Sequence, residues 1–223
     1  MTSKTKQYDN YFVEHYKSTL SEKDIITYKK WFSAQWRIIR KRVPVNKSTR
    51  VLEIGSGFGG LYSFLLEEGV KDYTGVELDK GIVDFSNNYF KTTSFKNVAI
   101  ENFDSKKKFD VIFAFEVLEH IENPSEVIET IGKLLKPNGV FCGTSPYPYK
   151  KNIKADLTHV SVLHPLNWER LFINKGFKVS YMRPMSFVPV LWRYSSRLNF
   201  AVPVYVPFRS VISTCLMVMK KAS

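Results

Sequence analysis

Short apolar runs alternate with segments of helical periodicity through most of the chain. The runs are rich in β-branched and aromatic residues, as buried strands are, whereas the segments between them repeat apolar residues every three or four positions. This alternation predicts parallel strands joined by crossover helices on both faces of one sheet. The predicted strands are 51–54, 72–78, 97–100, 109–115, 139–145, 177–182 and 211–219, and the predicted helices are 61–69, 82–90, 124–136 and 164–177.

Two further regions flank this alternating part. Residues 8–42 predict one or two helices, because inward positions recur at helical spacing before Pro44: Ile25, Tyr28, Phe32, Gln35 or Trp36, and Ile39. Residues 1–46 would form an N-terminal helical cap, and residues 184–209 an insertion between the last two strands. We expect one domain over 1–223 with an α/β fold: a Rossmann-like doubly wound sheet of about seven strands, mostly parallel, with an antiparallel C-terminal strand.

The stretch VLEIGSGFGG, residues 51–60, places a glycine loop between a predicted strand and a predicted helix. Read from Gly55, it matches G-x-G-x-x-G, the fingerprint of dinucleotide sites. Read from Glu53, it matches E-x-G-x-G-x-G, a loop that holds S-adenosylmethionine. Glu77 ends the next predicted strand about 20 residues further on, where a carboxylate can accept hydrogen bonds from both hydroxyls of a ribose. Loop and acid together predict an adenosine ligand.

Three observations favour S-adenosylmethionine over a dinucleotide. Glu53 stands where a carboxylate would repel a pyrophosphate but attract a sulfonium or an ammonium. Tyr147 and Lys151 match the Y-x-x-x-K dyad of dehydrogenases, but Pro146 and Pro148 forbid the helix that this dyad needs. The sheet also ends in a strand pair rather than in a second mononucleotide-binding half.

With these features the chain resembles the class I S-adenosylmethionine-dependent methyltransferases. The segments that carry the resemblance are VLEIGSGFGG, YTGVELD, FDVIFAFEVLEHIENP, LLKPNGVFCGTSP and GFKVS. FEVLEH followed by NP is similar to the subgroup that includes ubiquinone-biosynthesis O-methyltransferases and many small-molecule and sugar methyltransferases. The resemblance implies a methyl transfer to an oxygen of a small molecule or a glycan.

The resemblance also implies which residues bind the cofactor. Glu53 and the loop would hold the methionyl part, Glu77 the ribose, and Asp104 the adenine amino group. Phe103 could equally be a core residue, and Asp104 could simply start a turn. The full set of cofactor-binding residues is Glu53, Gly55, Ser56, Gly57, Gly59, Glu77, Leu78, Phe103, Asp104, Phe115 and Glu116.

A hydroxyl that attacks the methyl group benefits from a base that takes its proton. Of the histidines we favour His159 as this base over His120, for which a role in shaping its loop fits at least as well. His164, which precedes Pro165, has the position of a structural residue at a helix start. No cysteine or histidine spacing indicates a metal, and we expect none.

The net charge of +12 at pH 7 raises the question of nucleic acid. Most of the basic residues are lysines spread along the chain, which favours a solvated surface, and the N/D-P-P-Y motif of base-modifying enzymes is missing from the end of the fourth strand. We therefore expect a small-molecule or glycan acceptor. An N-methyltransferase, or a nucleic-acid or membrane-associated binding protein that keeps the fold, remains the alternative.

Composition also suggests where the protein works. Neither a signal peptide nor a membrane span is evident, and Cys142 and Cys215 lie in apolar runs as buried thiols would, so we expect a cytoplasmic protein. The 184–209 insertion could roof the substrate pocket, form a dimer interface or rest on a membrane. Its poor periodicity makes peripheral membrane contact the least favoured of the three.

Overall fold

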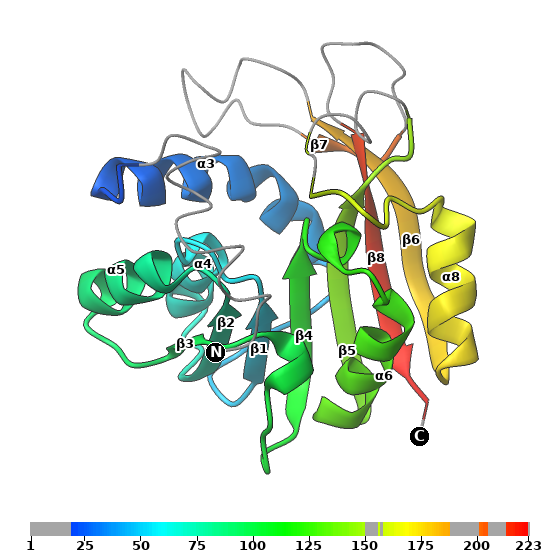
Figure 1. Cartoon of the computed structure of the whole chain (residues 1–223), viewed down its shortest axis with the longest axis horizontal. Coiled ribbons are helices and arrows are strands. Elements are labelled where there is room, and N and C mark those ends of the chain that lie inside the picture. Colours follow the sequence, from blue (N-terminus) through cyan, green and yellow to red (C-terminus); the bar gives the residue numbers. More distant parts are fainter. Residues whose placement is uncertain (1–18, 150–155, 157, 188–200, 205–212, 223) are drawn as a thin grey trace.

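The computed structural model of the chain describes residues 19–149, 156, 158–187, 201–204 and 213–222. These residues form an eight-stranded sheet in the order β3-β2-β1-β4-β5-β8-β6-β7, with helices on both of its faces (Figure 1). The strands are β1 (Arg50–Ile54), β2 (Asp72–Glu77), β3 (Phe95–Asn97), β4 (Phe109–Phe115), β5 (Leu135–Pro146), β6 (Phe177–Phe187), β7 (Ala201–Val202) and β8 (Ser213–Lys221). The helices are α3 (Glu22–Ile39), α4 (Gly60–Glu67), α5 (Lys80–Phe90), α6 (Pro124–Leu134) and α8 (Pro165–Asn174), with 3-10 turns η1 (Ile100–Asn102) and η2 (Leu118–His120).

The strand directions confirm the predicted fold class. The five strands from β3 to β5 pair in parallel, and β8 is antiparallel to both of its neighbours, β5 and β6. The strand beyond the expected seven is β7, which pairs with the end of β6. Because β6 continues to Phe187, the insertion predicted from residue 184 starts later than expected; its residues 188–200 and 205–209 lie outside the described residues.

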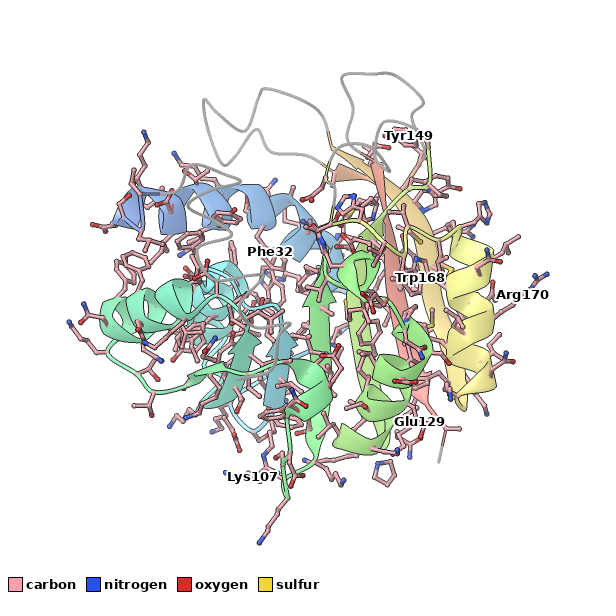
Figure 2. The ribbon with its side chains drawn as sticks, viewed as in Figure 1. Phe32, Lys107, Glu129, Tyr149, Trp168 and Arg170 are labelled. Atoms are coloured by element: carbon pink, nitrogen blue, oxygen red, sulfur yellow. The ribbon has the colours of Figure 1, made fainter. Side chains whose placement is uncertain are left out.

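Each face of the sheet has its own apolar core. Successive residues of a strand point to opposite faces, so Val51 of β1 joins the core under α3 and α4, while Leu52 joins the core under α6 and α8. Figure 2 shows the same division on α8, where Trp168 points toward the sheet and Arg170 away from it. Helices on both faces thus cover the parallel strands, as a doubly wound sheet requires.

The strand predicted at 97–100 is wrong in position, because β3 ends at Asn97 and Ile100 begins η1. The side-chain amide of Asn97 donates hydrogen bonds to the carbonyl oxygens of Glu77 (3.1 Å) and Leu78 (2.7 Å). These bonds tie the chain to the end of β2, so it leaves the sheet edge there in spite of the apolar residues that follow.

The helix ends follow from local chemistry. At the start of α3, the backbone N–H of Ser21 donates to Asp24 at 2.9 Å, a capping-box contact. At the start of α8, Nδ1 of His164 accepts from the N–H of Leu166 at 3.3 Å, ahead of Pro165 at the first helical position. The structural role predicted for His164 is confirmed. Of the helices predicted over 8–42, residues 8–18 lie outside the described residues.

The sheet also fixes the place of a binding crevice. β1 and β4 are neighbours, but the chain runs from β1 outward to β2 on one side and from β4 outward to β5 on the other. Ligands of doubly wound sheets bind beyond the carboxyl ends of the strands at such a switch in strand order. In Figure 1 these carboxyl ends point toward α3, which extends over that edge of the sheet.

The cysteines and the helices can be compared with what the composition predicts about thiols and membrane spans. Cys142 and Cys215 are buried free thiols, as expected. Among the helices of the described part, none combines the length and the apolar composition that a membrane crossing requires.

Candidate active site

The loop after β1 owes its shape to three alternate glycines. Gly55, Gly57 and Gly59 have φ values of 68°, 47° and 70°, in the left-handed region that favours glycine. A Cβ at Gly55 would lie 2.3 Å from Cγ2 of Val117. Gly60, by contrast, is the first residue of α4, and a Cβ there would meet nothing closer than 3.5 Å. The backbone therefore follows the E-x-G-x-G-x-G alternation rather than the dinucleotide fingerprint.

Glu77, at the end of β2, lies against this loop. Its carboxyl oxygens accept hydrogen bonds from the backbone N–H groups of Gly57 (3.0 Å), Leu78 (2.7 Å) and Asp79 (3.1 Å). Burial raises the pKa of Glu77, and these three N–H groups oppose that rise. The carboxyl group is thus fixed beside the loop, and Oε2, which accepts the bond from Gly57, has a second lone pair that can accept from a ligand hydroxyl.

Glu53 is buried near the carboxyl end of β1. Its Oε2 accepts a hydrogen bond of 2.5 Å from the hydroxyl of Tyr73 on β2. Burial raises the pKa of Glu53 to about 8; the Tyr73 bond opposes the rise, and the charge of Glu77 adds to it. Ser56, in the loop, is also buried, and its hydroxyl forms a hydrogen bond with Tyr73. Glu53, Tyr73 and Ser56 thus form a buried polar group beside the loop.

The residues predicted to contact adenine lie at the next strand ends. Leu78 follows β2 and is half-buried. Phe103 follows η1, is half-buried, and packs with Phe109 at a ring distance of 6.4 Å, so it also serves the core. Asp104 is exposed. The structure thus puts Leu78 directly after β2, on the side of the loop, whereas Phe103 contacts the first residue of β4, and the adenine roles of Phe103 and Asp104 stay predictions.

Phe115 and Glu116 end β4. Phe115 packs edge-on against Phe32 of α3 at 4.8 Å, and Figure 2 shows Phe32 pointing from α3 toward the sheet. Glu116 has φ 54°, an uncommon value for a residue with a side chain. It accepts a 2.7 Å hydrogen bond from Thr214 of β8, and burial raises its pKa. Backbone strain at non-glycine residues is concentrated at functional sites, so the positive φ of Glu116 favours a functional role for this residue.

His120 and His159 come together beside Glu116. Their rings meet edge to face at 4.8 Å. Thr158 donates to Asp156 at 2.6 Å, so its oxygen accepts from Nδ1–H of His120 at 2.8 Å and leaves the lone pair of that ring on Nε2. His120 therefore ties turn η2 to the 156–161 segment. His159 is close enough to Glu116 for its charge to lower the pKa of that carboxyl group.

Three groups that sequence reasoning missed lie in this region or on the helix above it. Glu119 is fully buried, and burial together with the charge of Glu116 holds its pKa well above the usual value. Gln35 of α3 is fully buried with neither amide atom hydrogen-bonded among the described residues. Tyr73 holds Glu53. A polar residue at an inward helical position was the signal for Gln35; nothing in the sequence distinguishes Glu119 or Tyr73 from ordinary neighbours.

Glu119, His120 and His159 could also hold a metal ion. Each offers one ligand atom, and these atoms lie within 4.8 Å of one another. One carboxylate and two imidazoles are ligands that divalent transition metals accept. The absence of a metal site stays a prediction, and the chemistry derived below does not depend on it.

Comparisons with known proteins show the family and the fold. A family model of a methyltransferase domain matches residues 28–181, more than half of the chain. A structure of an S-adenosylmethionine-dependent methyltransferase from Mesorhizobium loti is similar in fold, with a TM-score of 0.66 and 15% sequence identity, covering 84% of this chain and 98% of that one.

Curated relatives are similar in sequence over part of their length. A ubiquinone biosynthesis O-methyltransferase of Actinobacillus pleuropneumoniae is 31% identical over 101 residues, 41% of this chain and 43% of that protein. Its mitochondrial counterpart in Dictyostelium discoideum is 23% identical over 214 residues, 76% of this chain and 65% of that protein. The chain therefore spans about half to two thirds of the curated relatives that it matches.

Proposed function

Because the chain belongs to the class I S-adenosylmethionine-dependent methyltransferases, we propose that it transfers the cofactor's methyl group to an oxygen of a small molecule or a glycan. The observation that carries the proposal is the convergence of two groups of residues at the β1/β4 switch point. One is the glycine loop with Glu77, and the other is the cluster of Glu116, His120 and His159. The O-methyltransferase names of the curated relatives support oxygen as the methyl acceptor.

The first group holds the cofactor. We assign the methionyl part to the loop and Glu53, the ribose to Glu77, and the adenine to Leu78, Phe103 and Asp104. Support comes from the three glycines with positive φ, of which Gly55 and Gly59 also leave no room for a Cβ, and from the buried hydroxyl of Ser56. These features fit a ligand with a zwitterionic amino-acid end. We further infer that residues 1–223 act as one methyltransferase domain.

The second group serves the acceptor. The bound cofactor supplies a methyl group on sulfur that is already activated for in-line displacement. The chain needs only to align the acceptor hydroxyl and to remove its proton. His159 would take that proton on a ring nitrogen, and the cofactor held by the loop would supply the methyl group that replaces the proton on the acceptor oxygen. The carboxyl group of Glu116 lies near His159, and Phe115 and Phe32 form an apolar wall beside Glu116.

The test is an acceptor screen read by formation of S-adenosylhomocysteine. Phenols, simple glycosides and primary amines of matched size are compared on the wild-type chain, on His159→Ala and on His164→Asn. His164 is the control, because it caps α8 and packs edge-on against Tyr147, and asparagine can replace it as a cap. We expect turnover with hydroxylated acceptors, a loss of about 10²- to 10⁴-fold in His159→Ala, and unchanged affinity for S-adenosylhomocysteine.

Other outcomes would redirect the proposal. Turnover with amines alone would establish the N-methyltransferase alternative. A loss in His120→Ala that exceeds the loss in His159→Ala would transfer the role of base to His120. Cofactor binding without turnover of any hydroxylated acceptor would contradict the acceptor class.

A further inference from the structure

Tyr73 and Glu53 form a buried acid–phenol pair next to the glycine loop, joined by the 2.5 Å hydrogen bond between them. Parallel pairing aligns Val51 with Tyr73 and Glu53 with Gly75, so these four positions share one face of the sheet. The phenol of Tyr73 must therefore reach past Gly75 to meet Glu53.

The missing side chain of Gly75 opens that path. A Cβ at Gly75 would lie 2.8 Å from the hydroxyl of Tyr73 and 2.8 Å from Oγ of Ser56. Both distances are too short for a real Cβ contact, so any side chain at residue 75 would push the phenol or the loop away. Gly75 thus allows β2, β1 and the loop to bring three polar groups together.

Neighbouring rings hold the phenol in place. The Tyr73 ring packs against Tyr62 of α4 at 4.5 Å and against Phe95 of β3 at 5.6 Å, and only 5% of Tyr73 is exposed. A ring confined in this way cannot swing out to bond water, so its O–H remains aimed at Glu53. The carboxyl group of Glu53 is thus oriented by Tyr73, next to the glycine loop.

We propose that Tyr73 is a positioning residue of the cofactor site. It orients the carboxyl group of Glu53 toward the ammonium group of the bound cofactor. It also keeps the carboxyl group of Glu53 ready to ionise, so that cofactor affinity rises with pH. The inference rests on the role of Glu53 in cofactor binding proposed above. It does not depend on the identity of the acceptor.

The direction of the pH effect follows from the groups around Glu53. Burial raises the pKa of Glu53 to about 8, the Tyr73 bond lowers this pKa, and the charge of Glu77 raises it. The register partner of Glu53 on β4, Phe113, carries no charge. Tyr62 of α4 acts electrostatically on Tyr73. In the free protein Glu53 therefore holds a proton at neutral pH. An ammonium group attracts the ionised form, so binding releases that proton to the solvent and becomes tighter as the pH approaches 8.

The experiment is calorimetric titration with S-adenosylhomocysteine, which has the ammonium group but no sulfonium charge. Wild type, Tyr73→Phe and Tyr62→Phe are compared from pH 6.5 to 9, in two buffers of different ionisation enthalpy that report proton release. Tyr62→Phe is the matched control, since it removes a phenol hydroxyl from the same aromatic cluster but none that bonds Glu53. Thermal unfolding without ligand checks that each variant folds.

We expect wild type and Tyr62→Phe to release up to one proton per ligand near pH 7 and to bind more tightly up to pH 8. Tyr73→Phe should bind about tenfold more weakly at pH 7, as for loss of one hydrogen bond to a charged group, and should approach wild type only at higher pH. Glu53→Gln should bind weakly with no release of this proton at any pH.

Several results would overturn the inference. Equal weakening of Tyr73→Phe at every pH would mean that the phenol has only a structural role. Proton release that persists in Glu53→Gln would place the titrating group elsewhere. A wild-type chain that binds no S-adenosylhomocysteine at any pH would instead refute the cofactor assignment, whereas a wrong acceptor class would leave all of these measurements unchanged.

Discussion

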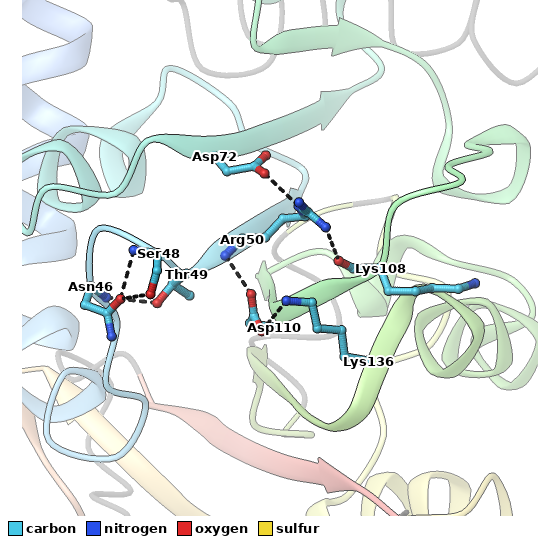
Figure 3. Close-up of polar contacts among 8 residues, drawn as sticks. All are labelled: Asn46, Ser48, Thr49, Arg50, Asp72, Lys108, Asp110 and Lys136. Carbon is cyan, nitrogen blue, oxygen red and sulfur yellow. Dashed lines mark hydrogen bonds and ion pairs between the residues drawn. The ribbon is translucent and has the colours of Figure 1, made fainter.

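β2 begins with Asp72 and ends with Glu77, and β4 has Asp110 near its start and Glu116 at its end. At the amino edge of the sheet, Arg50 binds Asp72 through Nε at 2.7 Å and Asp110 through its backbone N–H at 2.8 Å, while Lys136 binds Asp110 at 2.7 Å (Figure 3). Partial burial opposes the effect, but the bonds from Lys136 and Arg50 keep the pKa of Asp110 below its usual value.

At the carboxyl edge of the same sheet, the pKa values of the acids are shifted in the opposite direction. Burial raises the pKa of Glu53, Glu77, Glu116 and Glu119. Acids at the amino edge thus bond to arginine and lysine supplied by the chain itself. Acids at the carboxyl edge are bonded by a phenol, a threonine hydroxyl and backbone N–H groups, and burial outweighs these bonds, a cost that a site for charged ligands explains better than stability does.

Of the variants that test this comparison, Glu77→Ala should have the largest effect. It removes the carboxylate beside the glycine loop and with it the proposed bonds to the ribose, so affinity for S-adenosylhomocysteine should fall by about 100-fold or more. For wild type, ligand at 100 times its dissociation constant stabilises by ~2.7 kcal/mol, roughly 2–4 °C in unfolding temperature. Thermal unfolding with and without ligand measures the shift, which should vanish in Glu77→Ala.

The control lies on the same strand. Asp72→Ala removes an acid from the other end of β2, where the Arg50 pair is partly exposed and contributes little. The ligand shift should persist in Asp72→Ala. If the ligand-induced shift in unfolding temperature were lost in both variants, acids at both ends of β2 would affect ligand binding, and the comparison between the two edges would be wrong.

Glu119→Gln should stabilise the free protein. A group whose folded pKa is raised contributes stability that is present below its unfolded pKa, about 4.3, and is lost as the pH rises toward the folded pKa. Removing the group should therefore raise the free energy of unfolding at pH 7 and add close to nothing at pH 4. Urea unfolding at several pH values measures the gain, and a gain independent of pH would contradict the explanation.

Asp110→Asn should have the smallest effect and the opposite sign. The pKa of Asp110 is lowered, so its contribution is present above the unfolded pKa, about 3.9, and is lost as the pH falls through the folded pKa. The backbone N–H of Arg50 loses a charged acceptor, and the half-exposed Lys136 pair adds little, so the cost at pH 7 should be about 1 kcal/mol. Urea unfolding measures this cost, and cofactor affinity should not change.

Sequence reasoning anticipated the elements whose signal is local. The glycine loop, its neighbouring strands and the start of α8 follow from periodicity, positive-φ glycines and Pro165. It misplaced β3 because the end of that strand depends on Asn97 bonding to the carbonyls of β2, a contact between distant segments. A pattern of apolar residues contains no information on such a bond.

In the site, too, the sequence predicts only what depends on local signals. Glu77 lies against the loop, where its spacing predicts it, whereas the state of Glu119 depends on which segments cover it. The backbone N–H groups of Val160 and Ser161, some forty residues away, both bond the carbonyl of Glu119, whose side chain is fully buried. Tyr73 reaches Glu53 only because two strands are in register at Gly75.

The position of β8 has a consequence for synthesis on the ribosome. β8 is the last described strand in the sequence, yet it lies inside the sheet between β5 and β6, and its Thr214 completes the contacts of Glu116. While β8 is still in the exit tunnel, β5 has an open edge and β6 has no partner on the side that β8 will fill. A nascent chain can therefore form the cofactor loop early, but its acceptor side is assembled only when the final strand emerges.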